Sequence, residues 1–401
     1  MSRVTVQPQP TTPGPNLRSD ERDALNAPSS AKPSLVKTRT VEIDGIRGWA
    51  SVSVLLFHVL SEMLGTLVPA LRSHWLHPLL NGELAVAIFF VLSGDALSSP
   101  FFQSEKATDV DRLVLKRYPR LTVSITLSCV FVFALLEAGL DFHRAAAVIA
   151  HREEWLGSML NLVPSAQGLL KYCLLGVYTS HSGQTSYNPF LWTMSIELVG
   201  SMIVFLACYL WERLRWPVQT ITGACIALLL LNSDYSLFFA GMIFGYLRKT
   251  GFLERVKAKS GWQLGGWLAV TAVYGLLAVL TAPRLPYLNQ LAAIILVFSF
   301  YTNRTFIAFF QSRLSRWFGD LSFPIYLVQF PVIISLMSWL LVSASSTGGR
   351  EISHLQLGAI AVATLGVVMA ASMLFRAIED RILRSVNRRT VSLLFRGIES
   401  R

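Results

Sequence analysis

Long apolar runs are the feature that most limits what this chain can fold into. Segments close to the ~20 apolar residues that a helix needs to cross a bilayer recur along the sequence. They lie near residues 48–68, 82–100, 121–140, 189–210, 217–232, 234–247, 264–282, 287–301, 323–343 and 355–375. The fifth and sixth runs are short and close together, so a helical hairpin is an alternative for them. Only 15% of the residues are charged, against about 25% in soluble domains. We therefore predict an all-α integral membrane protein with about ten transmembrane helices.

The distribution of positive charge predicts how these helices are oriented. The formal net charge is +11. If the N-terminus is cytoplasmic and ten spans follow, 29 of the 35 Lys and Arg residues lie on the cytoplasmic side. Because positive residues collect in cytoplasmic loops, both termini are expected in the cytoplasm. The basic residues then meet anionic lipid rather than nucleic acid. The expected location is a membrane, crossed several times, and the plasma (inner) membrane if the source is bacterial.

Composition divides the chain into three regions. Residues 1–40 are polar and rich in Pro, Ser and Thr, which predicts a disordered cytoplasmic tail. Residues 41–380 form the predicted membrane domain, and residues 381–401 a basic cytoplasmic tail. The longest non-cytoplasmic connection, 141–188, holds two apolar pieces too short to cross convincingly, which we expect in the interface or as re-entrant segments. The four cysteines have no spacing typical of a disulfide framework or a zinc site, and no metal is expected.

Two ionisable residues in the first predicted span indicate a functional site. Arg47 and His58 lie eleven positions apart, about three turns or ~16 Å of α-helix. They are expected on one face, with Arg47 at the cytoplasmic mouth, His58 near mid-membrane and Glu62 one turn further on. Ionisable groups at that depth normally face a protein interior or a watery cavity. We expect Arg47 and His58 to share one water-accessible passage, although a histidine that only joins helices is the alternative.

Glu197 lies at the start of a predicted span, in the stretch FLWTMSIELVGS. A carboxylate that orients a neutral imidazole makes the ring a better base for a hydroxyl proton. A histidine on a facing helix is therefore the chemically useful partner for Glu197. The alternative is a carboxylate that only supports helix packing.

A basic group precedes the third predicted span. Lys116, Arg117 and Arg120 surround Pro119 in KRYPRL. Arginine offers paired donors and lysine a point charge, so the group suits phosphates. Ordinary positive-inside anchoring is the alternative.

Two further polar sets interrupt apolar runs. Ser93 and Asp95 flank a glycine in the second span, where they either line a substrate cavity or lie near the cytoplasmic surface. Ser322, Tyr326 and Gln329 share one face of the ninth span. Hydrogen bonds between helices are the alternative role for that face.

Five motifs in this order resemble the acyltransferase 3 family of integral membrane O-acyltransferases. They are DGIRGWASVSVLLFH, FFVLSGD, KRYPRL, LWTMSIE and GDLSFPIYLVQFPV, and together they extend over about residues 41–380. The resemblance implies transfer of an acyl group, usually acetyl from acetyl-CoA, to a hydroxyl. The implied acceptors are a surface glycan, a lipid-linked sugar, peptidoglycan or a small secondary metabolite. The implied partners are the lipid bilayer, acyl-CoA as co-substrate and that acceptor, with no bound cofactor.

The resemblance also implies roles for particular residues. His58 becomes the catalytic base, and Glu197 the acid of the Trp-x-x-x-x-Glu block. The implied acyl-CoA-binding residues are Arg47, Lys116, Arg117 and Arg120. The implied cavity residues are Asp44, Glu62, Ser93, Asp95, Trp192, Ser195, Tyr326 and Gln329. Direct transfer and an acyl-enzyme intermediate both stay open.

Two positions depart from the family pattern. Asp95 stands where an aromatic residue usually follows Ser-Gly, and Gln329 stands where a histidine is usual. A mechanism with two histidines is therefore doubtful. Two other functions stay open: a proton-coupled transporter whose relay is His58, Glu62 and Asp95, or a non-catalytic scaffold.

Overall fold

The regular elements of this protein are helices. The computed structural model describes residues 41–104, 107–280, 287–346 and 352–394, and contains no strand within those ranges. The predicted tail at 1–40 and residues 395–401 lie outside them. The last helix continues to Leu394, into the segment predicted as a basic tail.

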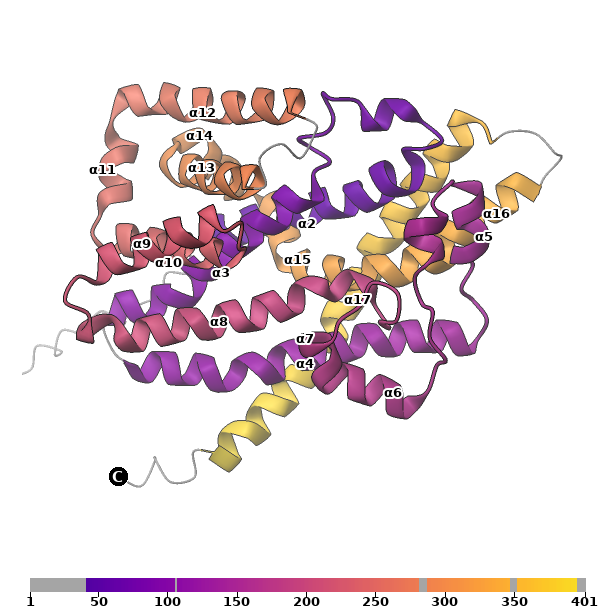
Figure 1. The fold of residues 1–401 in the computed structure, drawn as a ribbon, viewed down its shortest axis with the longest axis horizontal. Helices are drawn as coiled ribbons and strands as arrows, with labels where there is room; N and C mark the ends of the chain where they lie inside the picture. Colours follow the sequence, from indigo (N-terminus) through magenta and orange to yellow (C-terminus); the bar gives the residue numbers. More distant parts are fainter. Residues whose placement is uncertain (1–40, 105–106, 281–286, 347–351, 395–401) are drawn as a thin grey trace, which may run out of the picture. The chain divides into compact units, whose positions relative to one another are not determined.

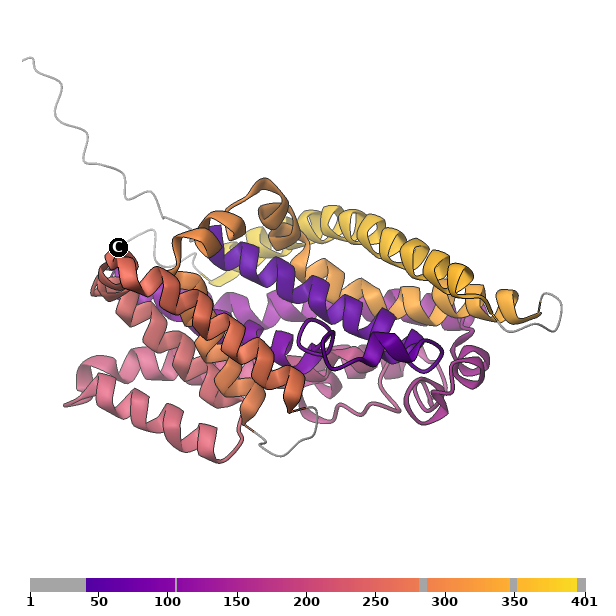
Figure 2. The same ribbon diagram turned by 90° about the horizontal axis from the view of Figure 1, so that it is seen from above.

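The long helices lie roughly side by side in Figures 1 and 2. In chain order the larger elements are α2 (Val41–Leu56), α3 (Gly82–Ser104), α4 (Ala107–Glu137), α8 (Thr193–Leu210), α9 (Pro217–Leu230), α10 (Tyr235–Lys249), α12 (Ser260–Val279), α13 (Leu288–Thr302), α15 (Arg313–Val332), α16 (Ser338–Ser346) and α17 (His354–Leu394). Shorter helices are α5 (His143–Ile149), α6 (Ala166–Lys171), α7 (Val177–Thr179), α11 (Phe252–Ala258) and α14 (Arg304–Phe310). Short 3-10 or π segments are η1 (Phe57–Leu64), η2 (Pro69–Arg72), η3 (Glu153–Gly157), η4 (Tyr172–Gly176), η5 (Pro189–Trp192), η6 (Trp211–Arg213) and η7 (Ile333–Met337).

The lengths of these helices fit a membrane protein. Among the described residues, seven helical stretches are long and apolar enough to cross a bilayer, and there are eight if the pair α13–α14, bent by 92°, is one span. The predicted class, an all-α membrane protein, is confirmed. The number ten and the side on which the termini lie stay predictions. Helices α9 and α10, 14 and 15 residues long, pack against each other, as expected of the hairpin alternative.

Two glycines explain how the first span packs. A Cβ atom on Gly48 of α2 would lie 2.4 Å from the backbone nitrogen of Gly319 in α15, and one on Gly319 would lie 2.4 Å from the carbonyl oxygen of Asp44. Only residues without a Cβ allow the two backbones this close. The motifs around Gly48 and Gly319, far apart in sequence, therefore meet in space.

The apolar interior consists of two packed clusters, and α2 belongs to both. Its first half, including Ile46 and Val54, packs with α3, α8, α10 and α13. The segment from Leu55 onwards, including Val59, packs with α4, α15, α17 and the 143–191 region. His58 therefore lies close to the boundary between the two clusters.

The connection between α4 and η5 contains only short helices. It includes α5, η3, α6, η4 and α7, none of them long enough to cross a membrane. Several contacts attach it to the spans: the Phe142 amide donates to the Ile334 carbonyl at 2.9 Å, and the Thr66 hydroxyl donates to the Ala150 carbonyl at 2.5 Å. The expected short, non-crossing pieces are thus present.

Candidate functional site

The helix that carries His58 changes its winding at the site. Helix α2 ends at Leu56, and Phe57–Leu64 continue as the π-helix η1. π-Helical segments are rare and are frequent at functional sites. The prediction of one continuous α-helical face through Arg47, His58 and Glu62 is therefore wrong beyond Leu56, because π winding places more residues in each turn. Glu62 instead forms an ion pair with Arg152 from the 138–188 connection.

Gln329 is the hydrogen-bond partner of the His58 ring. The His58 Nδ1 atom lies 3.1 Å from Oε1 of Gln329. The Gln329 amide is oriented by its own Nε2, which donates to the Tyr326 carbonyl at 3.2 Å. Because an amide oxygen only accepts, the proton of the neutral imidazole must be on Nδ1. Within the described part of the chain Nε2 of His58 makes no hydrogen bond, so its lone pair is available.

Aromatic rings hold the imidazole in place. The Phe190 ring stacks on His58 with centroids 3.8 Å apart and an interplanar angle of 18°. Trp155 lies parallel at 6.2 Å. The Phe190 backbone is held in turn by the Tyr326 hydroxyl, which donates to the Phe190 carbonyl. The Tyr326 hydroxyl also forms a hydrogen bond with the Thr193 hydroxyl at 2.7 Å. The ring of His58 therefore has a fixed plane as well as a fixed tautomer.

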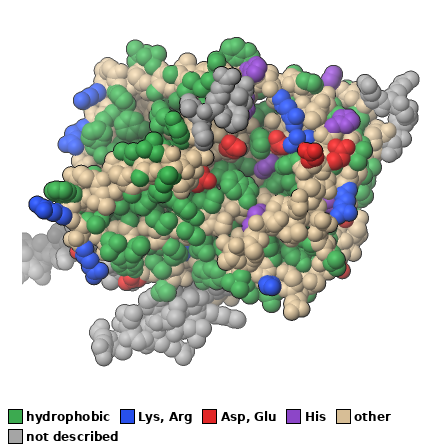
Figure 3. Space-filling model, viewed as in Figure 1, with side chains coloured by type: hydrophobic (Ala, Val, Ile, Leu, Met, Phe, Trp, Pro, Cys, Tyr) green, Lys and Arg blue, Asp and Glu red, His purple; other side chains and the backbone are tan. Residues whose placement is uncertain are grey.

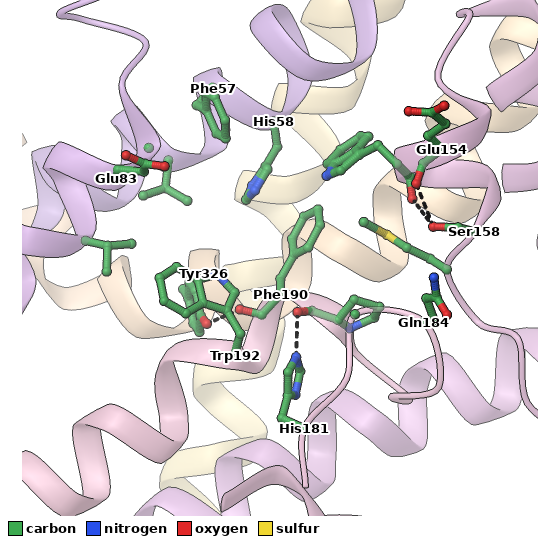
Figure 4. A pocket seen from close by; sticks show the side chains of 17 residues that line it. Phe57, His58, Glu83, Glu154, Ser158, His181, Gln184, Phe190, Trp192 and Tyr326 are labelled. Carbon is green, nitrogen blue, oxygen red and sulfur yellow. Dashed lines mark hydrogen bonds between the residues drawn. The ribbon is translucent and has the colours of Figure 1, made fainter. Parts of the chain in front are cut away.

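His58 opens onto a cavity of about 430 Å³. Its 17 lining residues come from the junction of α2 and η1, the start of α3, η3, the 181–184 segment, η5 and α15. Figure 4 shows the imidazole between Glu83 on one side and Glu154 on the other, above Phe190 and Tyr326. Figure 3 shows acidic, histidine and basic side chains close together on one part of this face. A cavity of this size suits a small molecule or one unit of a larger one.

Glu197 has a different partner from the one expected. Its carboxylate accepts from Arg117, in an ion pair, and from the Ser93 hydroxyl at 2.8 Å. The Nε atom of Arg117 also donates to Ser201 at 2.8 Å. Glu197 thus pairs with Arg117 of α4 instead of the expected histidine. His58 has Gln329 as its hydrogen-bond partner. Ser93 belongs to this Glu197 network.

Arg47 joins the same charged group from α2. It interacts electrostatically with Glu197 and Asp44, and with Arg117 and Arg120. Its Nε atom is buried without a hydrogen bond. Lys116 and Arg120 are exposed on α4, which continues as a helix through Pro119.

This cavity does not form the expected common passage from Arg47 to His58. Arg47 is absent from its lining, as is Arg117. The basic group is thus not part of the wall of this cavity.

Asp95 is completely buried in a network of its own. Arg248 donates to both of its carboxylate oxygens, at 2.6 and 2.8 Å. Tyr301 donates at 2.7 Å and Ser99 at 2.9 Å. The charge that departs from the family pattern therefore joins α3, α10 and α13. His58, Glu62 and Asp95 have separate partners, so the structure does not bring the three groups of the proposed proton relay together.

Only some of the remaining predicted cavity residues line the cavity. Trp192 and Tyr326 line the cavity, whereas Ser195 does not. The Ser195 hydroxyl donates to the Trp192 carbonyl at 3.1 Å. Asp44 lies against Gly319, as described above.

Sequence reasoning missed several lining residues. They are Glu83, Glu154, Trp155, His181 and Phe190. Four of them belong to the connection after α4 or to η5, where no helical periodicity marks a face. A Trp next to two acids in an extramembrane connection is the one signal that pointed to this wall.

Comparison with known proteins supplies the family. A sequence profile described as an acyltransferase domain matches residues 40–373. No curated protein and no solved structure matches the chain significantly. The matched range covers most of the chain, including every motif named above. The protein therefore belongs to the acyltransferase 3 family and is a membrane acyltransferase.

Proposed function

We propose that the protein moves an acyl group, acetyl in the simplest case, from acyl-CoA to a hydroxyl, with His58 as the general base. The observation that carries this proposal is the hydrogen bond between His58 and Gln329. The Nδ1–H group donates to Gln329, so Nε2 offers its lone pair beside a cavity large enough for the acceptor. A base within reach of the hydroxyl proton is the first geometric requirement for this catalysis.

The reaction on this geometry is direct transfer. The acceptor hydroxyl loses its proton to Nε2 of His58 while its oxygen attacks the thioester carbonyl carbon. A carbon–oxygen bond forms, the carbon–sulfur bond breaks, and the thiolate of CoA takes the proton back from the imidazolium. The products are the ester and free CoA, so His58 returns to its neutral form.

The donor is proposed to bind at the charged group of α2 and α4. Arg47, Lys116, Arg117 and Arg120 supply positive charge for the CoA phosphates. Glu197 acts there as a positioning residue, because its ion pair and the Ser201 contact fix the Arg117 guanidinium. The flexible pantetheine arm would then carry the thioester towards His58.

The acceptor is proposed to enter the cavity from the side of the 138–188 connection. A surface glycan, a lipid-linked sugar or a small metabolite can each present a hydroxyl there. Trp155, Phe190 and Trp192 offer ring faces for the body of the acceptor. Glu83, Ser158 and Gln184 offer polar contacts at the same place.

Turnover of radiolabelled acetyl-CoA by the protein purified in detergent tests the proposal. His58→Gln should reduce acyl transfer by roughly 10²- to 10⁴-fold, the usual contribution of a general base. His354→Gln is the matched control, since His354 is exposed at the start of α17 and outside the cavity. Full activity in His58→Gln would refute the role of His58. Solute flux without acyl transfer would instead favour the transporter. Loss of both activities would favour the scaffold.

A further inference from the structure

The charge of the cavity contrasts with the charge of the chain. The whole sequence has a net charge of +11. The 17 residues that line the cavity include two glutamates, Glu83 and Glu154, and no lysine or arginine. Within the described residues, the wall of this cavity therefore carries acidic but no basic side chains.

Among the described residues, the cation and the two histidines near the cavity do not reverse this balance. Arg152 lies near the cavity, with its guanidinium 5.2 Å from the Trp155 ring centre, but its charge is matched by Glu62. Burial lowers the pKa of His181, and its Nε2 donates to the Pro189 carbonyl at 3.1 Å, so this ring is neutral at pH 7. Burial also lowers the pKa of His77, near Glu83.

The two carboxylates retain capacity for a ligand. Glu83 accepts one hydrogen bond, from Asn289 to Oε2 at 2.8 Å, which leaves Oε1 for another donor. Glu154 is exposed, and the Ser158 hydroxyl donates to its backbone carbonyl at 2.8 Å rather than to its carboxylate. Figure 4 shows the two acids on either side of His58. A donor group on the acceptor can therefore meet a carboxylate while its hydroxyl lies at the imidazole.

The aromatic wall favours the same kind of ligand. Trp192 lines the cavity and is 44% exposed, and ring faces attract cations. A phosphate or carboxylate on the acceptor would instead lie close to like charge, which is repulsive in a partly dry site.

From these observations we propose that the acceptor carries a protonated amine near the reacting hydroxyl, as in an amino sugar or an amino-sugar-bearing metabolite. The inference rests on the proposed function and narrows its acceptor class. Glu83 and Glu154 bind the ammonium group, the aromatic rings cover the carbon skeleton, and His58 takes the hydroxyl proton.

Three methyl glycosides with one skeleton test the proposal. They differ at a single carbon, which carries a dimethylamino group, a hydroxyl or a carboxylate; the tertiary amine cannot itself form a stable amide. With radiolabelled acetyl-CoA, kcat/KM should be greatest for the amine, by about tenfold over the neutral glycoside, and lowest for the carboxylate. Equal or greater activity with the neutral or anionic glycoside would overturn the inference and leave the proposed function intact. No transfer to any of the three, with no hydrolysis of acetyl-CoA, would count against both.

Variants that remove the negative charge of Glu83 or Glu154 test whether these two carboxylates cause the preference for the amine. Glu83→Gln and Glu154→Gln should each lower kcat/KM for the amine by a larger factor than kcat/KM for the neutral glycoside. Glu153→Gln is the matched control, because Glu153 is the exposed neighbour outside the lining, and it should keep the full preference. An unchanged preference in the double variant would overturn the assignment to these two carboxylates.

Discussion

A side-chain hydrogen bond between His58 and Gln329 orients the imidazole, with 3.1 Å between Nδ1 and Oε1. Gln329 is fully buried, so water does not replace it when it is removed. In this chain, the residue that departs from the family pattern holds the ring in the form that a base requires.

Gln329→Leu should therefore lower kcat by roughly 10- to 100-fold, part of the ~10²–10⁴-fold that a general base contributes. The KM for acetyl-CoA should change little, since the variant alters the ring rather than the donor site. Gln329→His, which restores the usual family residue and can still accept from Nδ1, should keep most of the activity. The ¹⁵N spectrum of histidine-labelled protein should show loss of the Nδ1–H tautomer at His58 in the leucine variant. An unchanged tautomer would contradict the role given to Gln329.

Glu197→Gln should act on the donor rather than the acceptor. Loss of the ion pair frees the Arg117 side chain, so the KM for acetyl-CoA should rise severalfold while the KM for the acceptor stays constant. Glu212→Gln is the control, an exposed acid just beyond the same helix. Steady-state kinetics with each substrate varied in turn measure the KM for acetyl-CoA and the KM for the acceptor. A change confined to the KM for the acceptor would show that Glu197 acts on acceptor binding, which would contradict this prediction.

Asp95→Ala should destabilise the protein without a direct effect on chemistry. It leaves Arg248 unpaired where the guanidinium is only 22% exposed, and loss of one partner from a buried pair costs about 3–5 kcal/mol. The thermal midpoint in detergent should fall clearly. Asp95→Ala with Arg248→Met should recover part of the loss. Activity per folded molecule should stay near the wild-type value, and a selective loss of activity at unchanged stability would indicate a functional charge instead.

Gly241→Ala should separate helices α3 and α10. A Cβ atom at this position would lie 1.9 Å from the Val91 carbonyl oxygen and 2.6 Å from the Asp95 amide nitrogen. Backbone atoms cannot move aside as a side chain would, so a loss at or above the usual 1–3 kcal/mol of overpacking is expected. Gly275→Ala, where nothing lies within 4 Å, is the matched control and should be neutral or slightly stabilising. Equal thermal midpoints for the two variants would contradict this packing.

Stability should fall in mild acid, with a contribution from His181. Burial lowers the pKa of this histidine in the folded protein below its value of about 6.5 in the unfolded chain. The folded state therefore binds fewer protons, and the contribution is present above pH 6.5 and is lost as the pH falls from there through the folded pKa. The thermal midpoint should drop between pH 7.5 and pH 5, and His181→Gln should reduce that drop. An identical pH dependence in the variant would rule out His181 as a source.

The sequence predicted the parts of this protein that depend on local pattern. Apolar runs predicted most of the long helices, and the family resemblance grouped His58 with Tyr326 and Gln329, of which Gln329 bonds the His58 ring. The partners of charged groups could not be predicted, because they come from other helices: Arg117 reaches Glu197 from 80 residues away and Arg248 reaches Asp95 from 153. The cavity wall from Glu154 to Phe190 was missed for a related reason. Its residues lie in short helices and turns whose positions depend on tertiary contacts such as the Glu62–Arg152 pair.

The π winding of η1 has a consequence for how this gene can change. Each π turn takes in residues that a regular helix would not need, so a one-codon deletion just before His58 could be absorbed by a return to α geometry. Such a protein would still insert and fold, and the residues after η1 would keep their places, yet His58 would move by one helical position and rotate by about 100°. The imidazole would leave the aromatic stack, and a well-folded but inactive protein would result.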